Sequence, residues 1–145
     1  MIMEWLKTDY LSIRLAGTFF SERLGYDPTG KSAIDYFPDA TADIYKQFLT
    51  LVTVQPCVCN ITFVSMLKTG ASVQSEFQYL PMLSRDRKPI YILSAAIVLE
   101  SSRGRILDMD APEYPKIVEV SLLDVGYGMP DLSKNKTLSD IIDAS

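Results

Sequence analysis

Residues 57–66 read CVCNITFVSM, residues 73–82 read VQSEFQYLPM, and residues 90–99 read IYILSAAIVL. The first segment is rich in β-branched and aromatic residues, the second alternates polar and apolar side chains, and the third is a nearly continuous apolar run. These patterns predict three consecutive strands, of which the third is central in its sheet. Turn residues separate the segments at 69–72 and 84–89, so we expect an antiparallel arrangement of the three strands.

Shorter elements precede these strands. Alternating apolar residues at 2–6 and 11–15 predict two short strands around a polar bend. Thr18 is expected to cap a short helix that ends at Gly25. Apolar residues at three- and four-residue spacing predict a longer helix over 40–54. This order of elements predicts an α+β domain with an antiparallel sheet.

The composition is that of one folded domain with a slight excess of acidic residues. The 145 residues include 14 Lys and Arg against 18 Asp and Glu, which gives a net charge of −4, and 48% are hydrophobic. Because binding to phosphates requires a basic patch, nucleic acid is not an expected partner. The chain has no apolar run of about 18 residues and no basic N-terminal region followed by an apolar one. We therefore expect a cytoplasmic protein that inserts in no membrane.

Histidine is absent, and the two cysteines are Cys57 and Cys59. The lack of histidine excludes His-based catalytic triads, haem ligated by histidine and most zinc sites. One Cys-x-Cys pair cannot complete a tetrahedral zinc site by itself, so no metal site is predicted. The two cysteines are interpreted as small buried hydrophobic residues.

Five short motifs follow one another along the chain. They are RLAGT at 14–18, LG at 24–25, DPTG at 27–30, EFQYLPML at 76–83 and DVGYGMP at 124–130. Together with the order of elements, they resemble the PAS domains of a bacterial subfamily of small, often stand-alone proteins. The resemblance covers residues 1–100 and the last motif, and Pro28 stands where that subfamily usually has leucine.

The residues that carry the resemblance are Arg14, Gly17, Thr18, Gly25, Thr29, Gly30, Glu76, Pro81, Gly126 and Gly128. We expect them to shape the fold, because glycine permits positive φ where a strand or short helix must reverse. Arg14 lies on the polar side of its strand and either pairs with Glu76 or is solvated.

The resemblance implies a five-stranded antiparallel sheet with short helices and one longer helix on one face. It places the PAS core at residues 1–100 and a C-terminal extension at 101–145. An apolar segment at 117–125 predicts an additional strand in this extension, and 137–144 is either a short helix or a disordered tail. We expect no catalytic or DNA-binding output segment after the core, and therefore expect a signal to leave by contact.

The function implied by the resemblance is that of a stand-alone sensory or regulatory module. Such a module acts through protein–protein contacts. Here we expect contacts between two copies of the chain in a homodimer and contacts with an unidentified signalling partner. A small apolar ligand between the sheet and the helices is compatible with this function. The candidate lining residues are Tyr36, Phe37, Phe48, Ile61, Phe63, Phe77 and Tyr79, which could equally form a simple core.

Known PAS cofactors are not supported by the sequence. Haem would need a histidine, and the helical Asn-Cys-Arg-Phe-Leu-Gln pattern of flavin photosensors is missing, since Cys59-Asn60 has the reverse order in an expected strand. Sensors of acidic ligands use clusters of histidine and arginine, which this chain lacks. No cofactor is predicted.

Two alternatives remain beside the sensory module. One is a small enzyme on a cone-shaped α+β fold like that of nuclear transport factor two, although such folds usually begin with long helices. A Tyr79–Glu76 pair could move protons there only if both side chains faced the same side, and their spacing on one strand puts them on opposite sides. No enzymatic activity is expected. The other alternative is a structural adaptor that binds no small molecule.

Overall fold

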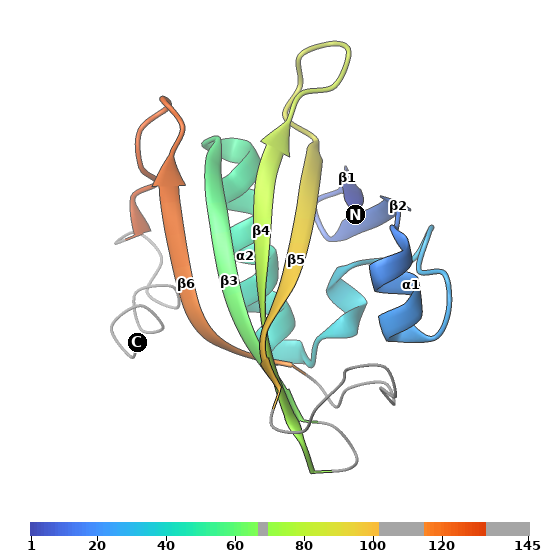
Figure 1. The fold of residues 1–145 in the computed structure, drawn as a ribbon. Coiled ribbons are helices and arrows are strands. Elements are labelled where there is room, and N and C mark those ends of the chain that lie inside the picture. Colours follow the sequence, from blue (N-terminus) through green and yellow to red (C-terminus); the bar gives the residue numbers. More distant parts are fainter. Residues whose placement is uncertain (67–69, 102–114, 133–145) are drawn as a thin grey trace.

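The computed structural model describes residues 1–66, 70–101 and 115–132. Six strands, two α-helices and one short 3-10 helix lie in these ranges (Figure 1). Their bounds are β1 Ile2–Lys7, β2 Tyr10–Leu15, α1 Thr18–Leu24, η1 Ile34–Tyr36, α2 Asp39–Val54, β3 Cys57–Met66, β4 Ser72–Met82, β5 Tyr91–Ser101 and β6 Lys116–Asp124. The elements follow the order that the sequence predicts.

One antiparallel sheet contains all six strands, in the order β2-β1-β5-β4-β3-β6. The three strands β3, β4 and β5 pair with their neighbours in sequence, as expected. The first hairpin joins the sheet where β1 pairs with β5, for example at Ile2 and Leu93. The additional strand expected at 117–125 is β6, which pairs with β3 on the other side of the sheet. The predicted α+β class is confirmed.

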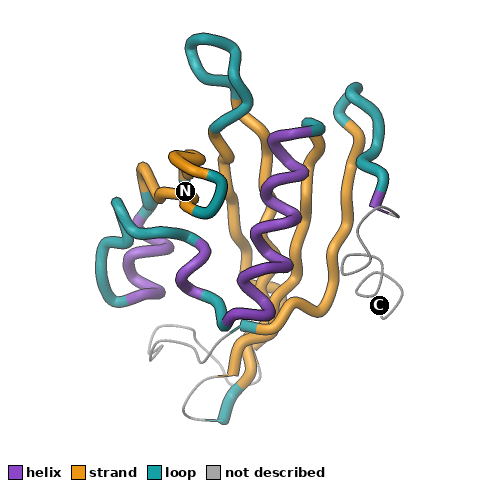
Figure 2. Tube along the Cα trace, turned by 180° about the vertical axis from the view of Figure 1, so that it is seen from behind, coloured by secondary structure: helices purple, strands orange, loops and turns teal. Residues whose placement is uncertain are grey.

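The helices cover one face of the sheet (Figures 1 and 2), and α2 packs against β3, β4 and β5. The buried apolar residues of α2 recur at three- and four-residue spacing; they are Tyr45, Phe48, Leu49 and Val52. Alternate residues of β3 point toward this helix, because side chains on a strand alternate between the two faces. These are Cys57, Cys59, Ile61 and Phe63, all buried. The core therefore forms where the helical and strand periodicities meet.

Three expectations about the motif residues differ from the structure. Gly17 has φ of −77°, so the chain does not need positive φ there. Gly17 is also the N-cap of α1, and Thr18 is the first helical residue, with no side-chain capping hydrogen bond. Arg14 does not pair with Glu76: its side chain is 56% exposed, as the solvated alternative predicts, and it also pairs with Glu4 at 3.2 Å between Nε and Oε2. The reason is the strand order, since β1 lies beside β2 whereas β4 is separated from β2 by two strands. The helix does end at Gly25 as expected, with φ of 74° in the left-handed region.

The loop after β6 is organised by one carboxylate. Asp124 Oδ1 accepts hydrogen bonds from the backbone N–H groups of Gly126 at 2.7 Å, Tyr127 at 3.0 Å and Gly128 at 2.9 Å. The two glycines have φ of 102° and 81°, which other residues adopt only with strain. The Gln55 side chain donates to the carbonyl of Gly128 at 3.1 Å and so ties the loop to the end of α2.

Replacing Asp124 by alanine is expected to lower the free energy of unfolding by about 1 kcal/mol, because three backbone donors lose their acceptor at an exposed site. Asp124→Asn keeps one acceptor oxygen and should lose about half as much. Urea denaturation measures both. Asp86→Ala, in the exposed loop between β4 and β5, is the control. An equal effect of Asp86→Ala and Asp124→Ala would contradict this role of Asp124.

Residues 133–145 lie outside the described residues, and with them the helix or tail expected at 137–144. In the part of the chain that the structure describes, no helix combines the length and the apolar character needed to cross a membrane. Cys57 and Cys59 are both buried free thiols. Burial raises the pKa of each thiol, so both are held in the protonated form at neutral pH.

Candidate ligand-binding site

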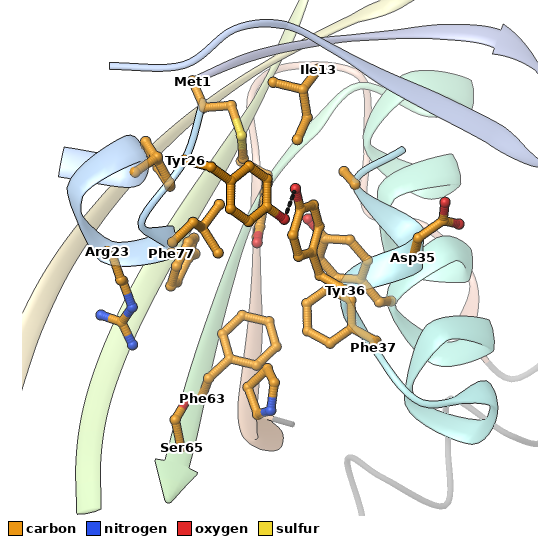
Figure 3. A pocket seen from close by; sticks show the side chains of 16 residues that line it. Met1, Ile13, Arg23, Tyr26, Asp35, Tyr36, Phe37, Phe63, Ser65 and Phe77 are labelled. Carbon is orange, nitrogen blue, oxygen red and sulfur yellow. Dashed lines mark hydrogen bonds between the residues drawn. The ribbon is translucent and has the colours of Figure 1, made fainter. Parts of the chain in front are cut away.

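A cavity of about 590 Å³ lies between the inner face of the sheet and the segment from α1 to the start of α2 (Figure 3). The residues that line it are Met1, Ile13, Phe20, Arg23, Leu24, Tyr26, Ala33, Asp35, Tyr36, Phe37, Tyr45, Phe63, Ser65, Phe77, Tyr79 and Pro115. Small-molecule sites commonly have volumes of about 300 to 1,000 Å³ and mostly apolar walls. The cavity has the size and the lining of such a site.

Aromatic rings form the wall on the sheet side. Phe63 on β3 and Phe77 on β4 point inward from neighbouring strands, and their ring centroids lie 5.3 Å apart with the planes almost perpendicular. Phe37, which follows η1, stacks near Phe63 at 5.5 Å. Edge-to-face and offset contacts of this kind stabilise the rings in fixed orientations. The three rings together form a continuous apolar surface on the sheet side of the cavity.

Five of the seven residues predicted to line a pocket do line this cavity: Tyr36, Phe37, Phe63, Phe77 and Tyr79. Phe48 and Ile61 differ from the expectation, because both are fully buried in the core and are not among the lining residues. Ile61 lies two residues before Phe63 on β3, and Phe48 lies almost one turn beyond Tyr45 on α2. Where α2 packs directly on the sheet, the side chains fill the space between them.

The motif residues shape the chain around the cavity. Thr29 donates from its backbone N–H at 3.0 Å and from its hydroxyl at 2.7 Å to the carboxylate of Asp27, and these bonds lower the pKa of that carboxyl. Gly30 follows with φ of 83°, so the chain reverses there and pairs its backbone with Ile13. Tyr26, immediately before this turn, is thereby placed at the cavity. The turn at 27–30 therefore positions Tyr26, which lines the cavity, although the turn residues themselves do not line it.

Tyr26 and Tyr36 meet at the cavity, where the Tyr26 hydroxyl donates to the Tyr36 hydroxyl at 2.8 Å (Figure 3). The bond joins the segment after α1 to η1. Burial, followed by this hydrogen bond, raises the pKa of Tyr36 well above its ordinary value. The Tyr36 hydroxyl is therefore neutral at physiological pH and can donate or accept hydrogen bonds. Tyr26 was not predicted from the sequence, because its turn-rich surroundings gave no periodicity.

Arg23, in the last turn of α1, is the cationic side chain of the lining. Its Nη2 donates to the hydroxyl of Ser75 on β4 at 3.1 Å. Burial lowers the pKa of its guanidinium, although an arginine remains charged at any physiological pH. The sequence reasoning missed Arg23. The available signal was its position three residues after the buried Phe20, which puts both on the inner side of the short helix.

Deeper in the core, Tyr45 and Tyr79 are fully buried and their hydroxyls interact. Burial raises the pKa of both phenols. Glu76 lies on the opposite face of β4 from Tyr79, so a proton-transferring pair of these two is not assembled. Among the described residues, no three His, Cys, Asp or Glu side chains gather where they could hold a metal ion. The site is suited to binding through apolar contacts and a few polar groups.

A twisted antiparallel sheet with helices on one face and an aromatic cavity beneath them defines a class of small α+β modules that can enclose a ligand. The family model for the PAS domain matches residues 1–97, and the chain belongs to this family. PAS domains are in general sensory and signalling modules that do not catalyse reactions. No curated protein and no solved structure matches the chain.

Proposed function

We propose that this PAS domain is a sensory module that holds a small, largely apolar ligand in the cavity and signals through protein–protein contact. The observation that carries the proposal is the aromatic cavity of about 590 Å³ between the sheet and α1, η1 and α2. The volume and the mostly apolar, aromatic lining fall in the range of small-molecule sites, which favours a ligand-binding module over a ligand-free structural adaptor.

The cavity is well placed to couple a ligand to the surface. Its outer wall is formed by α1 and η1. Arg23 of α1 donates a hydrogen bond to Ser75 on the sheet, and Tyr26, which follows α1, donates one to Tyr36 of η1. A ligand that contacts both the sheet and these helices stabilises the arrangement of helices and sheet to which it binds best, relative to the other arrangements. The helices and the sheet can therefore report whether the cavity is filled.

Fluorescence titration with N-phenyl-1-naphthylamine, a neutral aromatic probe, tests whether the cavity binds ligands. We expect micromolar binding to the wild-type protein and at least about tenfold weaker binding to Ala33→Leu, because leucine takes up cavity space. Ala40→Leu, on the exposed side of α2, is the matched control and should bind like the wild type. Native mass spectrometry of protein purified without denaturant should reveal any resident ligand. Absence of both added mass and probe binding would refute the proposal.

The partner that we propose for the contact is a second copy of the chain. The face of the sheet without helices carries an aliphatic row across four adjacent strands, formed by Leu15, Ile2, Leu93 and Leu80 in pairing order. Leu15 and Leu93 are exposed at 58% and 38%. Contiguous exposed apolar surface favours association, and in a twofold dimer this row would pack on itself.

Sedimentation analysis of Leu93→Glu tests this contact. A charge in the middle of the row is expected to raise the dimer dissociation constant by about 100-fold or more, because the carboxylate would be buried without a partner. Val54→Glu is the control, since Val54 lies at the end of α2 on the other side of the sheet and is 74% exposed. A wild-type monomer at high concentration, or equal effects of the two variants, would contradict the proposed dimer.

A further inference from the structure

Half of the Arg23 guanidinium is buried in the cavity wall without a hydrogen-bond acceptor. Nη2 donates to Ser75 Oγ at 3.1 Å, whereas Nη1 is shielded from solvent and has no acceptor among the described residues. Buried polar atoms are nearly always paired, and an unpaired donor on a charged group is costlier than one on a neutral group. Nη1 therefore marks a place where an acceptor is missing.

The neutral Ser75 hydroxyl cannot balance the charge of Arg23. Asp35 is the carboxylate that lines the cavity, and it is exposed. In Figure 3 it lies on the opposite side of the Tyr26–Tyr36 pair from Arg23. Burial is the cause that lowers the pKa of Arg23, and no carboxylate of the described residues opposes it. The cation thus faces the cavity with its charge uncompensated.

The surroundings of Arg23 separate into a polar end and an apolar wall. Ser75 and Ser65, on the neighbouring strands β4 and β3, are both buried on the inner face, and Ser65 lines the cavity. Next to them on the same face stand Phe77 and Phe63. Arg23 lies at one side of the cavity and the rings of Phe77 and Phe63 lie next to it (Figure 3), so a ligand that fills the cavity would meet both.

We propose that the cavity selects an aromatic organic anion, whose acidic group pairs with Arg23 while its ring lies against Phe63 and Phe77. This assignment rests on the proposed ligand-binding function and names its ligand class. A carboxylate, sulfonate or phosphate oxygen of a ligand would pair with the guanidinium of Arg23, which lines the cavity, and would balance its charge. Because Arg23 is partly desolvated, the pairing would discriminate between an acid and its neutral analogue.

Two fluorescent probes with the same ring system test the proposal. 8-Anilinonaphthalene-1-sulfonate carries a sulfonate, and N-phenyl-1-naphthylamine is its neutral counterpart. We expect Arg23→Gln to weaken the binding of the sulfonate by about tenfold or more and to change the binding of the neutral probe by less than about twofold. Arg23→Lys keeps the positive charge and should retain most of the preference for the anion.

The outcomes separate the two proposals. If the neutral probe binds but Arg23→Gln affects both probes equally or neither, the anion assignment is wrong while the ligand-binding function stands. If neither probe binds to the wild-type protein, both are wrong. Urea denaturation of each variant identifies a loss of folding. If Arg23→Gln is unfolded, Arg23→Lys provides the test. The ratio of its affinities for the sulfonate and for the neutral probe should stay close to that of the wild type, and loss of the preference for the sulfonate would refute the pairing.

Discussion

Replacing Phe48 by alanine is expected to lower the free energy of unfolding by about 4 kcal/mol, a large part of the stability of a domain of this size. Phe48 is fully buried between α2 and the sheet. Truncation to alanine removes most of its buried apolar surface and leaves a hole that neighbouring side chains fill incompletely. Urea denaturation followed by circular dichroism measures the effect.

Phe63→Ala provides the informative comparison, because Phe63 lines the cavity and Phe48 does not. We expect Phe63→Ala to change the affinity for N-phenyl-1-naphthylamine, and Phe48→Ala to change stability with little effect on that affinity. Val54→Ala, at the exposed end of α2, should cost less than about 0.5 kcal/mol. If Phe48→Ala lowered the free energy of unfolding no more than Val54→Ala does, this would contradict the packing of Phe48 between α2 and the sheet.

Raising the pH above about 10 is expected to unfold the domain steeply, because buried phenol and thiol groups cannot ionise in place. Burial raises the pKa of Tyr45, Tyr79 and Cys59 above their ordinary values in the folded state. The folded protein therefore retains protons that the unfolded chain releases. Their stabilising contribution is complete below the unfolded pKa values and is lost as the pH rises above them.

Each retained proton lowers the free energy of unfolding by about 1.4 kcal/mol per pH unit, so the three groups together approach about 4 kcal/mol per pH unit. Tyr79→Phe should reduce this slope by one proton, and it should cost about 1 kcal/mol at neutral pH because Tyr45 loses its hydroxyl partner. Denaturation at a series of pH values measures both. Tyr127→Phe, at an exposed loop position, should follow the wild-type curve. Equal stability at about pH 8 and pH 11 would show that the three groups are not buried together.

Much of the fold could be predicted from the sequence because each element buries one side. The alternation of Val73, Ser75, Phe77 and Tyr79 places these residues on one face of β4, as the structure shows. The bounds of α2 follow from its apolar spacing and from the proline after it. Details that depend on which strands become neighbours were not predictable in this way. The ion pair of Arg14 with Glu4 depends on β1 lying beside β2 and on which residues face each other across that pair.

The candidate site was predictable only in part, for a similar reason. Aromatic residues on the inner face were found because strands have a strict period of two. Whether such a residue borders a cavity or fills the core depends on how far α2 extends over the sheet, which separates Phe63 from Ile61. Arg23 and Tyr26 belong to a short helix and a turn, where no long periodicity reveals the buried side. The polar end of the cavity therefore became visible only in three dimensions.

The pairing of β1 with β5 also determines how the domain assembles over time. β1 is synthesised long before β5, yet Ile2 and Leu93 lie side by side in the sheet. Contacts between residues so far apart in sequence close large loops and slow the folding of a domain. During synthesis the first hairpin must wait, with its apolar side chains uncovered, until almost the whole PAS core has left the ribosome. Until then the uncovered hairpin is the part of the growing chain that is exposed to aggregation.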